Sequence, residues 1–273
     1  MTRVDLEYGA ATHVGLVRTD NEDAHLTVPP VFVVADGMGG HDAGDVASSF
    51  VVEEFARLAD EGLDAASAAR TVAAALDAVH TRIDEFDAEQ QAAGDPFFST
   101  GTTAVAAVLV ADVDAPYWLV ANLGDSRAYR FAAGELVQVT VDHSLVQELV
   151  DAGTIEADDA PDHPDSHIVT RALGGPVHHE PDLFTVPAEE SGRILLCSDG
   201  VNGMLAHDDI ARILGEHPDP ATAADEVVAA AVAAGGRDNA TAVVVDVVGL
   251  TREEPHVADV QRSATKQETG AHP

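Results

Sequence analysis

The sequence predicts an α+β fold in which helices flank antiparallel sheets. Strand-like and helix-like segments come in blocks along the chain rather than in strict βαβ alternation, which favours antiparallel sheets with separate helical layers. A tight turn at Gly134 joins two strand-like segments as a meander. The 273 residues contain no internal repeat and no low-complexity linker before residue 250, so residues 1–250 are expected to form one domain.

Six strands are predicted from short apolar runs that are rich in valine and bounded by Gly, Asp or Pro. They cover residues 31–35, 102–110, 117–122, 126–131, 193–198 and 240–248. After 126–131 the segment AAGELVQVT is expected to turn at Gly134 and return as a further short strand.

Helices are predicted where apolar residues recur at spacings of three and four. The two longest cover 45–60 and 64–92, and two more lie near 207–215 and 221–234. Residues 143–175 begin with the helical segment SLVQELVDAG and continue into the polar EADDAPDHPDSH, so a mobile surface flap is expected there. The polar residues 251–273 contain Pro255 and no periodicity, and are expected to be a disordered tail.

The composition is that of a globular protein, with 46% apolar and 23% charged residues. The formal net charge is −34, and so acidic a surface repels nucleic acid and anionic lipid, which bind basic patches. Neither a nucleic acid nor a membrane is therefore expected as a partner. Salt screens self-repulsion of this size, which suggests a high-salt or high-GC source.

A soluble, monomeric, cytoplasmic protein is expected. The first ten residues, MTRVDLEYGA, lack the apolar core of a signal peptide. The longest apolar runs fall far short of the ~20 residues that span a bilayer. Cys197 is the only cysteine, so no internal disulfide forms and a reducing compartment fits.

Four aspartates stand at the ends of strand-like segments, and three of them are directly beside a glycine: Asp36, Asp125, Asp199 and Asp238. Any single Asp-Gly pair is typical of a turn. If the strands lie side by side, however, the carboxylates form a cluster that only a bound divalent cation makes tolerable. Carboxylate, carbonyl and water oxygens suit Mg²⁺ or Mn²⁺, and there is no His/Cys cluster of the zinc type.

Eight segments resemble, in order and wording, the metal-dependent protein phosphatase 2C (PPM) family. They are GLVRTDNEDA (15–24), VVADGMGGHDAG (34–44), STGTTAVAAVL (99–109), ANLGDSRAYR (121–130), TVDHSLVQELVDAG (140–153), TRALGG (170–175), LLCSDGVNGML (195–205) and GGRDNATAVVV (235–245). Each segment alone is a weak signal. Their ordered set, which spans residues 15–248, is highly specific.

The resemblance implies a four-layer α/β/β/α sandwich of two antiparallel sheets, with two Mn²⁺ or Mg²⁺ ions in a cleft. In that pattern Asp36 bridges both ions, the Gly37 carbonyl binds one, and Asp199 and Asp238 complete the other. Glu22 and Asp23 act through water. Asp125, together with Asp199, helps to hold a third and weaker ion.

Arg18 precedes the NED segment by three residues, as the phosphate-binding arginine of the family does. A guanidinium suits bidentate phosphate contacts, and the alternative is a structural counter-charge for the carboxylates. Animal members carry a histidine directly after the bridging Asp-Gly as a general acid, whereas this chain has Met38. His41 and His143 are interpreted as structural residues.

Cys197 lies within an apolar run, where a small buried hydrophobe is the favoured interpretation and a redox handle the alternative. It lacks the Gly-rich anion-binding loop of a thiol phosphatase.

The resemblance therefore implies a bacterial-type phosphatase that hydrolyses phosphoserine and phosphothreonine, with Asp36, Asp199, Asp238 and Arg18 as catalytic residues. Its substrates would be phosphorylated proteins, among them a Ser/Thr kinase. One alternative is a catalytically inactive phosphoprotein-binding regulatory module on the same fold, which is expected to lack one or more metal carboxylates. The other is a two-metal phosphodiesterase or nuclease, which the charge of −34 opposes.

Overall fold

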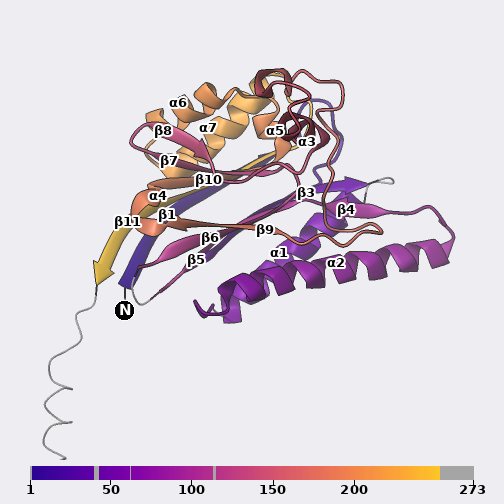
Figure 1. Ribbon diagram of the computed structural model, residues 1–273, viewed down its shortest axis with the longest axis horizontal. Helices are drawn as coiled ribbons and strands as arrows, with labels where there is room; N and C mark the ends of the chain where they lie inside the picture. Colours follow the sequence, from indigo (N-terminus) through magenta and orange to yellow (C-terminus); the bar gives the residue numbers. More distant parts are fainter. Residues whose placement is uncertain (1, 40–42, 62, 113–114, 253–273) are drawn as a thin grey trace, which may run out of the picture.

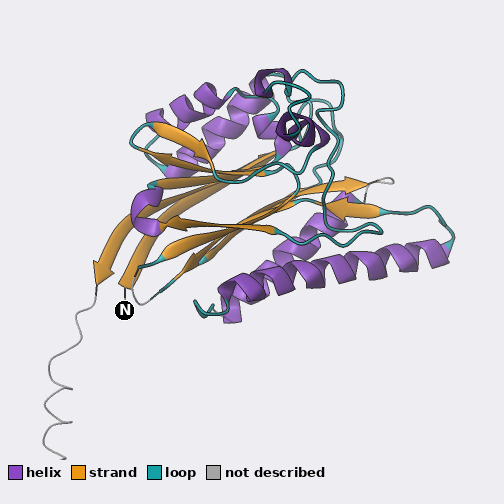
Figure 2. Ribbon diagram, in the orientation of Figure 1, coloured by secondary structure: helices purple, strands orange, loops and turns teal. Residues whose placement is uncertain are grey.

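The computed structural model describes residues 2–39, 43–61, 63–112 and 115–252. Figures 1 and 2 show four layers, in which helices cover the outer faces of two stacked sheets. The predicted tail falls on residues 253–273, outside the described part, and so does His41. Residues 251 and 252, which were also assigned to the tail, continue the last strand.

The strands are β1 (Thr2–His13), β2 (Asp23–Val28), β3 (Val31–Gly39), β4 (Thr100–Thr102), β5 (Ala104–Val110), β6 (Tyr117–Leu123), β7 (Arg127–Ala132), β8 (Glu135–Gln138), β9 (Asp182–Pro187), β10 (Arg193–Cys197) and β11 (Ala240–Arg252). The helices are α1 (Gly44–Glu61), α2 (Ala68–Ala93), α3 (Leu145–Asp151), the 3-10 helix η1 (Ala157–Asp159), α4 (Ala188–Ser191), α5 (Asp199–Asn202), α6 (His207–Glu216) and α7 (Pro220–Ala233). None of these helices combines the length and apolar character needed to cross a bilayer.

Within the described residues the strands form two sheets. One has the order β1-β11-β10-β7-β8, and the other has the order β2-β3-β5-β6-β9, with β4 paired to β3. All the paired strands are antiparallel. The predicted α+β architecture and its four layers are confirmed.

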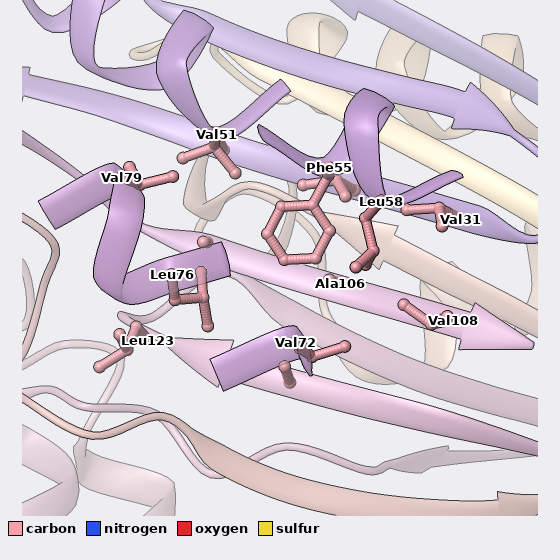
Figure 3. Close-up of a cluster of buried hydrophobic side chains, with 14 of the residues drawn as sticks. Val31, Val51, Phe55, Leu58, Val72, Leu76, Val79, Ala106, Val108 and Leu123 are labelled. Atoms are coloured by element: carbon pink, nitrogen blue, oxygen red, sulfur yellow. The ribbon is translucent and has the colours of Figure 1, made fainter. Parts of the chain in front are cut away.

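Alternate residues of β3 are buried on opposite faces of its sheet. Val31 and Val33 belong to the core under α1 and α2. Figure 3 shows Val31 in this core together with Val51, Phe55, Val72 and Leu76 of the two helices. Phe32 packs between the two sheets. Because both faces are covered, the strand reads as a continuous apolar run rather than as an alternating one.

The second sheet is covered by α6 and α7. Leu195 of β10 packs against Ile210 and Val227 of these helices. Asp219 caps the N-terminus of α7, with its carboxylate accepting from the Thr222 N–H at 2.7 Å. A third apolar cluster lies between the two sheets. Helices therefore cover the outer face of each sheet, and the inner faces pack against each other.

The prediction of one strand over 102–110 is wrong, because the strand breaks at Thr103. β4 pairs with the outer part of β3, from Gly37 to Gly39, whereas β5 pairs with Val31–Val34. The helix predicted over 64–92 begins only at Ala68, after a turn in which Ser67 N–H donates to the Asp64 carbonyl.

Candidate metal centre

The break between β4 and β5 at Thr103 fixes the position of the Asp36 backbone. Thr103 N–H donates to the Asp36 carbonyl at 2.9 Å, and Asp36 N–H donates to the Thr103 hydroxyl at 3.1 Å. The Thr102 hydroxyl donates to the same carbonyl at 3.0 Å. The backbone of Asp36 is therefore fixed from both sides of the interruption.

Both sheets contribute to the site. Asp23 begins β2 and stands opposite Asp36 in the register of β2 and β3. Asp125 lies in the connection from β6 to β7, which crosses from one sheet to the other. Asp199 begins α5 directly after β10, and Asp238 precedes β11. The four strand-end aspartates are thus collected at one end of the sandwich.

These carboxylates strongly disfavour one another's charge. Burial raises the pKa of Asp36 well above its ordinary value, and the charges of Asp23, Asp199, Asp125 and Asp238 add to the effect. Burial likewise raises the pKa of Asp125 to about 7. For Asp23 burial outweighs hydrogen bonds from Thr241 and Ser198 and raises the pKa to about 7. The cluster without a cation is an electrostatically unfavourable arrangement.

Ser198 connects the two sheets beside Asp199. Its hydroxyl donates to Asp23 Oδ2 at 2.7 Å and accepts from the Thr241 N–H at 3.0 Å. Gly200 lets α5 approach the start of β11 closely, since a Cβ on Gly200 would lie 1.8 Å from the Asn239 carbonyl oxygen. Burial, followed by the charge of Asp238, raises the pKa of Asp199.

Asn239 organises the loop that carries the NED segment, a role that the sequence did not reveal. Its Nδ2 donates to the carbonyls of Val14 at 3.0 Å and Asp20 at 2.9 Å, and its Oδ1 accepts from the Glu22 N–H at 2.8 Å. The signal available in the sequence is its place after Asp238, where a polar side chain immediately precedes a buried strand.

Glu22 and Gly37 meet at the start of α1. Glu22 Oε1 accepts from the Gly44 N–H at 2.8 Å, and the Glu22 carbonyl accepts from the Gly37 N–H at 3.2 Å. A Cβ on Gly37 would lie 2.2 Å from the Gly44 carbonyl oxygen. Only glycine therefore fits at residue 37 without displacing the start of α1.

The donor set fits hard divalent cations. Asp23 Oδ1 is buried without a hydrogen-bond partner in the described part of the chain, as expected of an oxygen that faces a cation. Nowhere in that part do three His, Cys, Asp or Glu side chains by themselves form a group that could hold a metal. Mg²⁺-type ions need no such cage, because they keep several waters and use only one or two carboxylates each.

The carboxylates open into a cleft of about 510 Å³. Asp125, Asp199 and Asp238 line one part of it. Its other walls come from α3, from η1 and the loop that follows it, and from the residues after α5. The predicted flap, 143–175, thus forms one side of the cleft.

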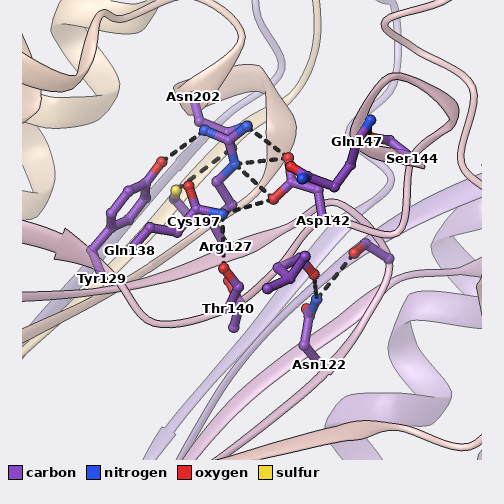
Figure 4. A network of polar contacts seen from close by, with 12 residues as sticks. Asn122, Arg127, Tyr129, Gln138, Thr140, Asp142, Ser144, Gln147, Cys197 and Asn202 are labelled. Atoms are coloured by element: carbon purple, nitrogen blue, oxygen red, sulfur yellow. Dashed lines mark hydrogen bonds and ion pairs between the residues drawn. The ribbon is translucent and has the colours of Figure 1, made fainter. Parts of the chain in front are cut away.

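Arg127 and Asp142 also line the cleft, and they form an ion pair that Figure 4 shows. Arg127 donates from Nε to both Asp142 oxygens at 2.9 Å and from Nη2 to Oδ2 at 2.6 Å. His143 is buried next to them, and its Nδ1 accepts from the Gly124 N–H at 3.1 Å while Nε2 faces Asp182 at 3.1 Å. This arrangement agrees with the structural interpretation of His143.

Cys197 is a buried free thiol. Burial raises its pKa to about 12, so the thiolate that a nucleophile requires is not formed near neutral pH. The interpretation as a small buried hydrophobe is confirmed.

Comparison with known families identifies the arrangement. A family model described as protein phosphatase 2C matches residues 11–233. The chain belongs to the protein phosphatase 2C family.

Among curated members of this family, the chain is 38% identical over 251 residues to the serine/threonine protein phosphatase PstP of Mycobacterium tuberculosis. That match covers 91% of this chain and 46% of PstP, so the chain spans about half the length of this relative. It is 36% identical over 243 residues to the serine/threonine phosphatase stp of Listeria monocytogenes, with 86% and 93% covered.

Solved structures of family members share the fold. The catalytic domain of PstP in complex with two manganese ions matches with a TM-score of 0.78 and 36% identity, covering 89% of this chain and 99% of that one. Stp1 from Staphylococcus aureus matches with a TM-score of 0.81 and 30% identity, covering 90% and 96%. The family and the fold predicted from the sequence motifs are confirmed.

Proposed function

We propose that the chain is a metal-dependent phosphatase that removes phosphate from phosphoserine and phosphothreonine in proteins. The observation that carries the proposal is a group of four aspartates, Asp23, Asp36, Asp125 and Asp199, whose pKa values are raised by burial and by neighbouring carboxylates beside a cleft, with Asp23 Oδ1 left unpartnered in the described part of the chain. Relatives named as Ser/Thr phosphatases and the manganese-containing structure of PstP support it.

Two Mn²⁺ or Mg²⁺ ions would be held by Asp36 as the bridge, the Gly37 carbonyl, Asp199 and Asp238. Glu22 and Asp23 would take part through water, and Asp125 would belong to a third, weaker site. When bound, such ions lower the pKa of water and offset the charge of a phosphoryl group.

Arg18 is assigned to the substrate phosphate. Its guanidinium is half-exposed and stands beside Asp238, so it lies next to the carboxylates while remaining accessible to solvent. Met38 occupies the place of the animal general acid and cannot donate a proton. The proton for the leaving Ser or Thr oxygen of the substrate would therefore come from water or from another side chain.

The partners in this proposal are phosphorylated proteins, a Ser/Thr kinase among them, and the chain acts as a cytoplasmic monomer. A single buried thiol suits a reducing compartment. The net charge of −34 continues to oppose polyanionic substrates such as nucleic acids.

The deciding experiment is hydrolysis of p-nitrophenyl phosphate and a phosphothreonine peptide by the purified protein with millimolar Mn²⁺, Mg²⁺ or EDTA. Turnover that requires the divalent ion is expected for both substrates. Absence of turnover on both substrates with either ion would contradict the proposal.

A further inference from the structure

Arg237 is a cationic side chain that the proposed chemistry leaves unused. It lies between α7 and β11, is exposed, and lines the cleft together with Asp199 and Asp238. In residues 2–39, 43–61, 63–112 and 115–252 its guanidinium has no hydrogen-bond or ion-pair partner. A free guanidinium on the wall of a substrate cleft is available to a ligand.

The other arginines near the cleft are already engaged. All three Arg127 bonds to Asp142, from Nε and Nη2, lie within 2.9 Å, and its Nη1 donates to the Tyr129 hydroxyl. Arg18 donates to Asp238 at 2.8 Å. Arg237 is therefore the cleft cation of the described chain whose charge is not already paired.

Gly235 has both Met204 and the stem of Arg237 as neighbours. A Cβ placed on Gly235 would lie 3.6 Å from Met204 Sδ and 4.0 Å from Arg237 Cγ. Met204 also lines the cleft. Met204 and the aliphatic stem of Arg237 thus both flank Gly235, and the exposed guanidinium is solvated in the cleft.

The charge of the whole molecule makes this cation notable. Forty-eight acidic residues against fourteen basic ones repel an acidic peptide at long range. That repulsion is screened beyond a Debye length of roughly 8–10 Å. Once the peptide is in the cleft, the nearest cation therefore has the largest effect on the binding of an anionic group. A guanidinium binds carboxylate and phosphate in the same bidentate geometry.

We propose that Arg237 is a specificity residue that binds an anionic group of the substrate, a carboxylate or a second phosphate, near the phosphorylated Ser or Thr. This inference rests on the proposed phosphatase function and names the substrate class of the same cleft. Peptides with acidic or phosphorylated neighbours are preferred over peptides with basic ones.

The test uses phosphothreonine peptides that carry Asp, phosphoserine, Ala or Lys at each position from −3 to +3. With the wild type and Mn²⁺, kcat/KM at one or more positions is expected to be about two- to fivefold higher for Asp than for Lys, as for an exposed ion pair. Asp and phosphoserine distinguish the two sources of the anion. The preference shrinks in molar salt.

The variants are Arg237→Ala, which should bring the Asp/Lys ratio to about one, and Arg237→Glu, which should invert it. Arg70→Ala is the matched control, because Arg70 is exposed on α2 outside the cleft and should leave the ratio unchanged. The ratio is compared within each variant, so a general loss of activity does not alter it.

Three results would overturn the inference: a wild type without preference, an Arg237→Glu variant with the wild-type preference, or an Arg237→Ala variant that slows all peptides equally. The last result would make Arg237 a counter-charge for the aspartates. The Kd ratio for non-hydrolysable phosphonate peptides is measured in parallel, and it reports on Arg237 even if no substrate is turned over. Failure of turnover alone would count against the phosphatase function instead.

Discussion

Arg18 and Asp238, which are 220 residues apart in the sequence, form an ion pair with 2.8 Å between Nη2 and Oδ2. The pair joins the loop before β2 to the residue before β11, and it matches the counter-charge alternative for Arg18. Phosphate binding by Arg18 stays a prediction. The two roles are compatible if Arg18 exchanges Asp238 for the substrate when Asp238 is engaged by a cation.

Arg18→Ala is expected to lower kcat/KM for a phosphothreonine peptide by about 10- to 100-fold, the loss of a charged hydrogen bond of roughly 1.5–3 kcal/mol. The kcat/KM of Arg18→Lys should lie between those of the wild type and Arg18→Ala, since lysine keeps the charge and loses the bidentate geometry. Steady-state kinetics with Mn²⁺ measure both. Arg57→Ala, at an exposed site on α1, serves as the control, and wild-type kinetics in Arg18→Ala would leave Arg18 with the counter-charge role alone.

Asp36→Asn is expected to abolish divalent-dependent turnover, because a neutral amide cannot bridge two cations. For the wild type, a cation at 100 times its Kd adds about 2.7 kcal/mol of stability, which thermal unfolding reports as a rise in Tm. The variant should lose this rise. In EDTA it should unfold no lower than the wild type, since the enclosed carboxyl that it replaces is unfavourable when charged.

The exposed Asp60→Asn on α1 controls for the charge change and should behave as the wild type. A Mn²⁺-induced rise in Tm that persists undiminished in Asp36→Asn would refute the assignment of Asp36.

The metal-free protein should lose stability as pH rises from about 4 to 8. The folded-state pKa values of Asp23 and Asp125 are raised to about 7, whereas unfolded aspartates titrate near 3.9. Between these values the folded state holds more protons than the unfolded state, so the free energy of unfolding decreases with increasing pH. The loss is complete above the folded-state pKa.

Tm measured in EDTA at pH 5 and pH 8 checks this dependence, with the higher Tm expected at pH 5. Saturating Mn²⁺ should diminish or reverse the difference, because cations stabilise the ionised carboxylates. A metal-free Tm that increases from pH 5 to pH 8 contradicts the prediction.

Gly200→Ala should destabilise the protein by about 1–3 kcal/mol, the usual cost of overpacking. The new Cβ would lie 1.8 Å from the Asn239 carbonyl oxygen and would push the loop with Asp238 away from α5, so activity should decline as well. Gly215→Ala is the control, because it is also helical and its Cβ meets only the Phe131 ring at 3.3 Å. Equal effects of the two changes in chemical denaturation would argue against the close approach.

The sequence predicted best those strands whose two faces are both buried. Residues 31–35, and residues 194–197 of the predicted strand 193–198, are continuous apolar runs because helices cover one face and the other sheet covers the second. β9 was missed because it has no run of buried apolar residues. Val186 is its only buried residue, and the other five are exposed or of intermediate exposure. β1 was missed because it is defined by pairing with β11, more than 200 residues away.

The residues of the candidate site likewise fall into those that a local sequence pattern predicted and those that it did not. The aspartates were found because each stands at one end of an apolar strand-like segment, which is a local pattern, and the ordered motifs assigned their roles. Thr103, Ser198 and Asn239 were not found, since their roles come from contacts between distant segments. Arg237 was not found because only the folded chain places it in the cleft. Asn239, for example, bonds to Glu22 across 217 residues, and no local pattern encodes that partner.

β11 is an interior strand of its sheet, between β1 and β10, although it comes after every other described strand in the sequence. During synthesis, β1 and β10 therefore have no shared neighbour until residues 240–252 have left the ribosome. Asp238 and Asn239 emerge in the same stretch, directly before β11. A chain that stops before β11 therefore lacks both the strand that joins β1 to β10 and the two residues, Asp238 and Asn239, that complete the candidate metal centre.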